Sequence, residues 1–151
     1  MDDDTAFSEL SALLTGLHDQ LLDLPADREL RPPITDMAKE YARRLRGTYP
    51  TKFPALLEAY KALASASPKP QINDALLAKL RATQAFKDNE TVAKQVVNVW
   101  YFSQFNDEAN KVVDGGFYEF GFVWPIIKAH PIGFSTQLHG YWTGKPPKEM
   151  N

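Results

Sequence analysis

The sequence predicts an all-α protein, a compact bundle of about five to six helices with an irregular, aromatic, Gly/Pro-rich C-terminal arm. Apolar residues recur at spacings of three and four in successive blocks, and Gly, Pro and polar residues separate these blocks. No internal repeat and no convincing pair of strands is visible in the sequence. We therefore expect a single domain over residues 1–151, with the arm at about residues 130–151.

The first helix is expected over residues 6–15. Asp4 or Thr5 is the expected N-cap, and Gly16 suits the end because glycine adopts the left-handed conformation easily. The apolar pattern continues over residues 21–24, as a second turn or a bent continuation, before a polar connector. The inner face of the first helix carries Phe7, Leu10, Leu13, Leu14 and Leu17.

The second helix is expected to begin near Pro32 and Pro33, with Thr35 as the rival cap, and to end at Gly47. Its inner face carries Ile34, Met37, Ala38, Tyr41 and Leu45. Basic residues gather near its C-terminus, where the helix dipole favours cations: Arg43, Arg44 and Arg46.

The third helix is expected to open at Thr51 and Pro54 and to end before the breaker-rich loop of residues 65–70. Its inner face carries Phe53, Leu56, Leu57, Tyr60 and Leu63. Asn73 is the expected cap of a fourth helix, whose inward residues are Leu76, Leu77, Leu80 and Phe86.

The fifth helix is expected to start near Asp88 or Asn89. Its β-branched residues are typical of a strand, but its length of about four turns and its 3–4 spacing favour a helix. We expect a polar loop over residues 106–116, then a short aromatic helix over residues 117–129 that bends near Pro125. The apolar residues of the fifth helix are Val92, Val96, Val97, Val99, Trp100 and Phe102.

Composition excludes several classes of function. The net charge is −2 and basic residues alternate with acidic ones, so nucleic acid is not an expected partner. The absence of cysteine excludes disulfides, thiolate zinc sites, cysteine-bound iron–sulfur clusters and covalent haem within this chain. No apolar run reaches the roughly 20 residues of a membrane span. The acidic N-terminus lacks the features of a signal peptide, so we expect either a cytoplasmic protein or one whose leader has been removed.

Histidines with nearby carboxylates are the candidate metal ligands of the chain. His18, Asp19 and Asp23 lie close in sequence, and His130 and His139 lie in the C-terminal arm. The spacings HxxxH and HExxH do not occur. We therefore expect these histidines to be surface or hydrogen-bonded residues, and we predict no metal site.

No catalytic or cofactor-binding constellation is predicted either. The glycines of residues 115–121 are flanked by bulky aromatic residues, which would obstruct the close backbone approach of a phosphate. Ser103 and Ser135 have no base at a diagnostic spacing. Glu119 is the acid of the aromatic stretch, and we expect it to reach solvent or to pair across an interface.

The C-terminal third concentrates the aromatic residues, with 12 of the 18 between Trp100 and Trp142. They could form an ordinary core or a docking surface, since aromatic residues dominate both. We expect Trp100 to be internal and Tyr141 and Trp142 to contact a partner. The candidate partner-binding residues are Trp100, Tyr101, Phe117, Tyr118, Trp124, Phe134, Tyr141, Trp142, Pro146 and Pro147.

Three segments together resemble a known family. Residues 7–16 read FSELSALLTG and resemble its opening "F-x-x-L-S-x-x-L-T-G". Residues 97–101 read VNVWY and resemble a late helix with an "x-W-Y" signature, and residues 140–147 read GYWTGKPP and resemble the ending "P-G-Y-W-x-x-x-P". The family comprises the small, gamma-type accessory subunits of bacterial FAD-dependent sorbitol, fructose and glucose dehydrogenase complexes.

The resemblance implies a helical, non-catalytic subunit that binds and helps to mature a large flavoprotein of the glucose–methanol–choline oxidoreductase type. It implies FAD in that partner and no cofactor here, a multihaem cytochrome c subunit reached through the complex, and export of the complex to the periplasm. Two positions depart from the family pattern. Ser135 lies about where members often have a cysteine, and His139 stands where the ending has proline.

Two alternatives remain from the residues alone. The chain could be a stand-alone, cytoplasmic helical protein whose aromatic region makes its own dimer contact. It could also be a small enzyme or metal-binding protein that uses Glu119, His130 and His139.

Overall fold

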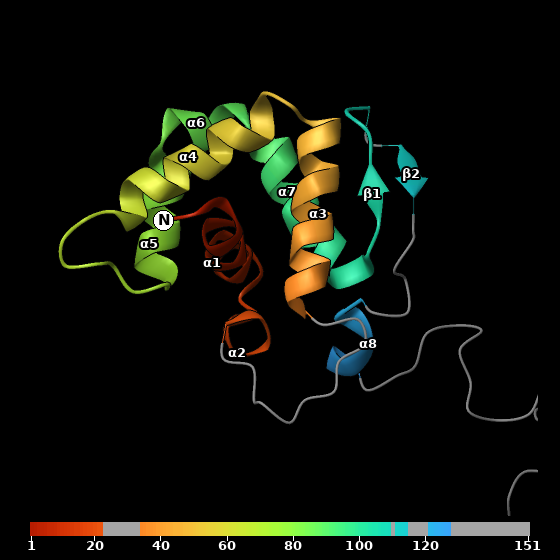
Figure 1. The fold of residues 1–151 in the computed structure, drawn as a ribbon, viewed down its shortest axis with the longest axis horizontal. Helices are drawn as coiled ribbons and strands as arrows, with labels where there is room; N and C mark the ends of the chain where they lie inside the picture. The colour runs from red at the N-terminus through yellow and green to blue at the C-terminus, as the bar shows by residue number, and fades with distance from the viewer. Residues whose placement is uncertain (23–33, 110, 115–120, 128–151) are drawn as a thin grey trace, which may run out of the picture.

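The computed structural model describes residues 1–22, 34–109, 111–114 and 121–127. These residues form α-helices and one small two-stranded sheet, which confirms the predicted all-α class (Figure 1). The elements are α1 (Asp3–Thr15), α2 (His18–Leu21), α3 (Ile34–Thr48), α4 (Lys52–Ala64), α5 (Asp74–Ala82), α6 (Gln84–Asp88), α7 (Glu90–Phe102), β1 (Phe105–Asn106), β2 (Val112–Asp114) and α8 (Val123–Ile126).

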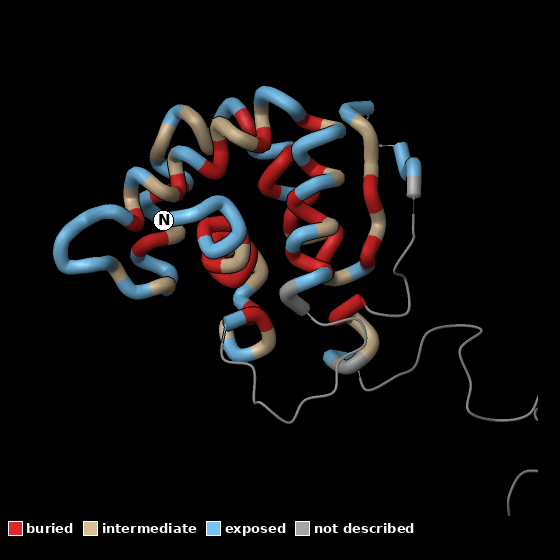
Figure 2. Tube along the Cα trace, viewed as in Figure 1, coloured by how far each residue is buried: buried red, intermediate tan, exposed pale blue. Residues whose placement is uncertain are grey.

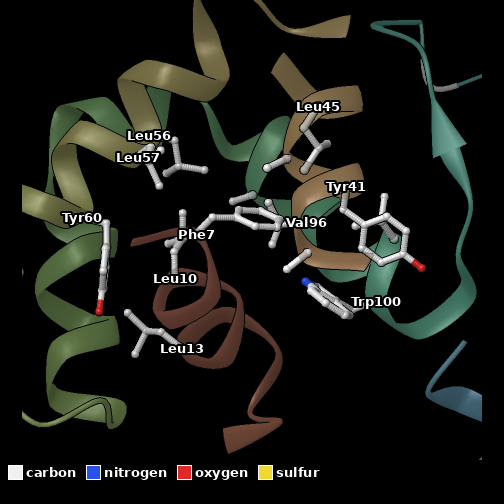
Figure 3. Packing of buried hydrophobic residues seen from close by; sticks show 14 of the residues in the cluster. Phe7, Leu10, Leu13, Tyr41, Leu45, Leu56, Leu57, Tyr60, Val96 and Trp100 are labelled. Carbon is white, nitrogen blue, oxygen red and sulfur yellow. The ribbon is translucent and has the colours of Figure 1, made fainter. Parts of the chain in front are cut away.

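The first helix is the centre of the bundle. α1 contacts α3, α4, α5 and α7, and the buried residues of the described chain face inward around it (Figures 1 and 2). Figure 3 shows Phe7 and Leu10 in the middle of this cluster, with α4 side chains on one side and α7 side chains on the other. Both side chains are fully buried, and such burial stabilises the fold by roughly 1.5–3 kcal/mol for each.

The ends of α1 follow capping chemistry. Asp2, not the predicted Asp4 or Thr5, is the N-cap, and its carboxylate accepts from the Thr5 backbone N–H at 2.9 Å. The helix therefore begins before the predicted residue 6, because this bond satisfies one of its free N–H groups. Gly16 ends it as predicted, with φ of 74°, and donates its N–H to the Ala12 carbonyl oxygen.

The predicted fourth helix is divided into two. Asn73 caps α5 as expected, since its side chain accepts from the Leu76 N–H at 3.1 Å. Thr83 adopts an extended backbone conformation, which ends α5. Its hydroxyl accepts a hydrogen bond from the Phe86 N–H and caps α6. Phe86 therefore lies on a separate short helix and is half-buried rather than fully inward.

The predicted polar loop over residues 106–116 contains a hairpin, so the expectation of no strands was wrong. β1 and β2 pair antiparallel, with Phe105 opposite Asp114. The Asp107 carboxylate accepts from the backbone N–H groups of Ala109 and Lys111, both at 2.9 Å, and this shapes the turn. The Tyr49 hydroxyl contacts the carbonyl oxygens at the end of β1 and fixes the hairpin to the end of α3.

The aromatic helix predicted over residues 117–129 is short where the structure describes it. Residues 121–127 are described, and α8 covers Val123–Ile126. In the described part of the chain no helix has the length and apolar character to cross a bilayer.

Candidate functional site

Trp100 lies inside the domain, as expected. Its indole is 1% exposed and meets the Tyr41 ring edge-on at 4.9 Å between centroids. It also stacks near Phe7 at 6.5 Å and contacts Phe122 at 6.1 Å. Trp100 therefore joins α1, α3 and α7. Its place among the candidate partner-binding residues is not supported, because the buried indole offers no surface to a partner.

The C-terminal end of α7 is held by Ser103. This residue has φ of 52°, a left-handed conformation that is uncommon outside glycine, and it is fully buried. Its hydroxyl shares a 2.8 Å hydrogen bond with the Tyr41 hydroxyl. Burial raises the pKa of Tyr41 to about 12, so its hydroxyl stays protonated and available to this bond.

Tyr101 connects the C-terminal end of α7 to the C-terminal end of α1. Its ring is half-buried, and its hydroxyl donates to the Thr15 carbonyl oxygen at the end of α1, at 2.9 Å. This bond satisfies one of the free carbonyls at that helix end. Tyr101 is therefore a positioning residue within the domain, and part of its ring remains accessible.

The segment before α8 docks on the end of α7. The Phe122 N–H donates to the Trp100 carbonyl oxygen at 3.0 Å, and the Phe122 ring is nearly buried. Gly121 makes this approach possible, because a Cβ atom there would lie 2.7 Å from the Tyr101 carbonyl oxygen. Trp124 follows in α8 and is half-buried.

Large apolar side chains are exposed at this end of the domain. We call the set formed by Phe102, Ile126 and Ile127 the apolar edge; their exposed fractions are 47%, 50% and 57%. Figure 1 shows α8 beside the end of α7, and the Gly121 contact with the Phe102 backbone agrees. Scattered exposed apolar residues are ordinary, but a group of large ones at one end is typical of a contact surface. The sequence pattern did not single out this set, because the isoleucines fit either face of a short helix.

The remaining candidates lie outside the described residues. These are Phe117, Tyr118, Phe134, Tyr141, Trp142, Pro146 and Pro147, together with Asp23, Glu119, His130, Ser135 and His139. Within the described residues, His18 is half-buried and Asp19 is exposed, and no group of three metal-binding side chains occurs there.

Comparison of the chain with protein-family models, curated proteins and solved structures found no match.

Proposed function

We propose that this chain is the non-catalytic small subunit of an FAD-dependent, glucose–methanol–choline-type sugar, polyol or alcohol dehydrogenase. In this role it binds the large FAD-containing subunit, stabilises it and assists its maturation. The FAD belongs to the partner, a multihaem cytochrome c subunit is reached through the complex, and the complex works in the periplasm.

The contact between two of the family-like segments supports this proposal. Residues 7–16 form most of α1 with its Gly16 end, and residues 97–101 lie at the end of α7. The Phe7 ring stacks near Trp100, and Tyr101 donates to Thr15. These two segments therefore stabilise the domain by packing against each other. In this proposal the apolar edge and residues 140–147 contact the partner.

The apolar edge is the observation that carries the proposal. Two of its three residues, Ile126 and Ile127, come just before residues 128–151, which carry Phe134, Tyr141 and Trp142. A stable interface of this type buries on the order of 2,000 Å². If this chain binds the folded flavoprotein and not the unfolded one, binding shifts the folding equilibrium of the flavoprotein by mass action. This effect needs no chemistry from this chain.

The direct test is co-expression with large FAD-dependent dehydrogenase subunits of the glucose–methanol–choline type. We expect a yellow complex with flavin absorbance to co-purify on a tag carried by this subunit. Lower flavoprotein solubility and flavin content when this chain is omitted would support the maturation role. Separate elution of the two proteins, with full flavin content in both cases, would refute the proposal.

Two sets of variants locate the contact. Trp142→Ala should weaken the complex by about 2 kcal/mol or more, as truncation of a buried aromatic anchor does, while Trp142→Phe should weaken it less. Ile126→Ser with Ile127→Ser should also weaken it, whereas Ala78→Ser, at an exposed position of α5, should not. If these variants bind the flavoprotein with the affinity of the wild type, the assignment of these residues to the contact is wrong.

Self-association is a second candidate because of β2. Val112 and Val113 are 54% and 58% exposed, and β2 pairs with β1 alone among the described residues. An exposed apolar edge strand can pair with a second copy of the chain. Light scattering of the isolated protein distinguishes the two functions, since a stable dimer that Val113→Lys dissociates would favour self-association.

A further inference from the structure

A cavity of about 360 Å³ lies on the side of the domain formed by α1, the end of α5, α6 and α7. Its volume falls within the usual range of small-molecule sites. The residues that line it come from α1 and from the three consecutive helices α5, α6 and α7: Leu14, Arg81, Phe86, Lys87, Glu90, Ala93, Lys94 and Val97. None of them belongs to the apolar edge or to the aromatic arm.

Four of the eight lining residues are apolar. Leu14 of α1 and Phe86 of α6 pack against the hydrophobic core but keep part of their surface outside it. Ala93 and Val97 lie one helical turn apart on α7, and the small Ala93 side chain leaves room between the neighbouring helices. An apolar ligand would cover surface that these side chains leave open to water.

The lining also carries three cations and one carboxylate. Lys94 pairs with Glu90 across one turn of α7, at 3.0 Å between nitrogen and oxygen. Within the part of the chain that the structure describes, neither Arg81 nor Lys87 has a carboxylate partner. The net positive charge beside the four apolar side chains is complementary to a ligand with one anionic head and an apolar body.

We propose that this cavity binds a small amphiphilic anion, an alkyl carboxylate or a molecule of the same chemistry. The anionic head lies between Arg81 and Lys87, and the apolar body contacts Leu14, Phe86 and Val97. The guanidinium of Arg81 can hold a carboxylate with two parallel hydrogen bonds. This site is separate from the proposed flavoprotein contact and does not depend on that proposal.

Titration of the full chain with alkyl carboxylates below their micelle concentrations tests the chemistry. We expect saturable binding of decanoate. Along the series hexanoate, octanoate and decanoate, the affinity should rise roughly fourfold for each added methylene that is buried. Decanol has the same tail without the charge and should bind at least tenfold more weakly than decanoate. Absence of saturable decanoate binding, or equal affinity for decanol, would overturn the proposal.

Charge-reversal variants test the location. Arg81→Glu and Lys87→Glu should each reduce decanoate affinity at least tenfold, while Lys79→Glu makes the same charge change outside the cavity and should leave it nearly unchanged. All three side chains are exposed, so folding should survive, and helical circular dichroism checks this. Val97→Phe should block binding by filling the interior. Equal losses in all three charge variants would show attraction to net charge alone and would refute a site here.

One further outcome would reassign the cavity. If decanoate fails to bind while Arg81→Glu weakens the flavoprotein complex, the cavity is part of a protein contact and the small-ligand proposal is wrong. If decanoate binds and the flavoprotein does not, the cavity proposal stands and the proposed function falls.

Discussion

Glu9 is a buried carboxylate whose two partners come from distant parts of the chain. It is 9% exposed, and it accepts from the Tyr60 hydroxyl at 2.9 Å and from the Lys69 ammonium at 2.5 Å. Burial, followed by the bond to Glu9 and its negative charge, raises the pKa of Tyr60. The Tyr60 hydroxyl therefore stays protonated and can donate at all physiological pH values. The network joins α1 to α4 and to the loop before α5.

Tyr60→Phe should lower the free energy of unfolding by about 1.5–3 kcal/mol, because Glu9 loses a hydrogen bond to a charged group in a buried place. Lys69→Met removes the other donor, whose side chain is 54% exposed, and should cost about 1 kcal/mol or less. Urea unfolding followed by circular dichroism measures both values. Equal costs would contradict the view that burial decides the worth of each bond.

Ser103 combines a hydrogen bond with a strained backbone, and two substitutions separate these contributions. Ser103→Ala loses the bond to Tyr41 and keeps the left-handed conformation. Ser103→Gly loses the same bond but removes the steric cost, which is about 1–2 kcal/mol for a residue with a Cβ atom. We expect the glycine variant to unfold at a higher urea concentration than the alanine variant. The opposite order would show that the conformation at Ser103 is unstrained.

At the scale of the element, the helical pattern was predictable where several apolar residues repeat. Phe7, Leu10 and Leu13 follow one face of α1, and all three are buried as expected. The break at Thr83 has a signal in the sequence that the prediction did not use, because Phe86 follows Leu80 by six positions and leaves the face of the helix that Leu80 shares with Leu76. The Thr83 side chain then caps the new helix. The hairpin was missed because strands of two and three residues are too short to show alternation.

The docking of α8 on α7 depends on Gly121, and a single methyl group tests it. In Gly121→Ala the new Cβ atom would meet the Tyr101 carbonyl oxygen at 2.7 Å, so the backbone must shift. We expect a loss of about 1–3 kcal/mol, as for other overpacked sites, and a changed tryptophan emission as Phe122 moves from Trp100.

Gly47→Ala is the matched control for Gly121→Ala. Gly47 lies within α3, and a Cβ atom there would have no neighbour within 4 Å. Alanine is the better helix former, so this variant should be neutral or more stable by up to about 1 kcal/mol. If neither glycine variant changes the free energy of unfolding, residues 121–122 do not pack closely on α7 in solution.

At the scale of the whole molecule, the sequence predicted the class of fold better than it predicted the site. Trp100 could be assigned to the interior because it continues the apolar face of a long helix. The cavity could not be found in this way, since Leu14 and Val97 are 83 positions apart in the chain and meet only through packing. The arm residues Tyr141 and Trp142 lie outside the described chain, so their role remains a prediction from composition and resemblance.

Ion pairs at the surface contribute to the response of the domain to acid. Hydrogen bonds from Arg43 and Arg44 lower the pKa of Glu40 to about 2. A hydrogen bond from Lys61 holds the pKa of Asp3 below its usual value, and Arg46 also pairs with Asp3. The charged carboxylates are favoured in the folded chain, so the unfolded chain binds more protons in acid.

The free energy of unfolding should therefore be constant above about pH 5 and fall as the pH decreases toward 2, the folded pKa of Glu40. Glu40→Gln should lower stability at pH 6 and reduce the decline between pH 5 and pH 2, because the group that titrates is gone. Raising the salt to about 0.5 M should reduce the contribution of these exposed pairs in the wild type. Urea midpoints at pH 6, 4 and 2 measure the effect. An identical decline in wild type and Glu40→Gln would show that the arginine contacts of Glu40 do not persist in solution.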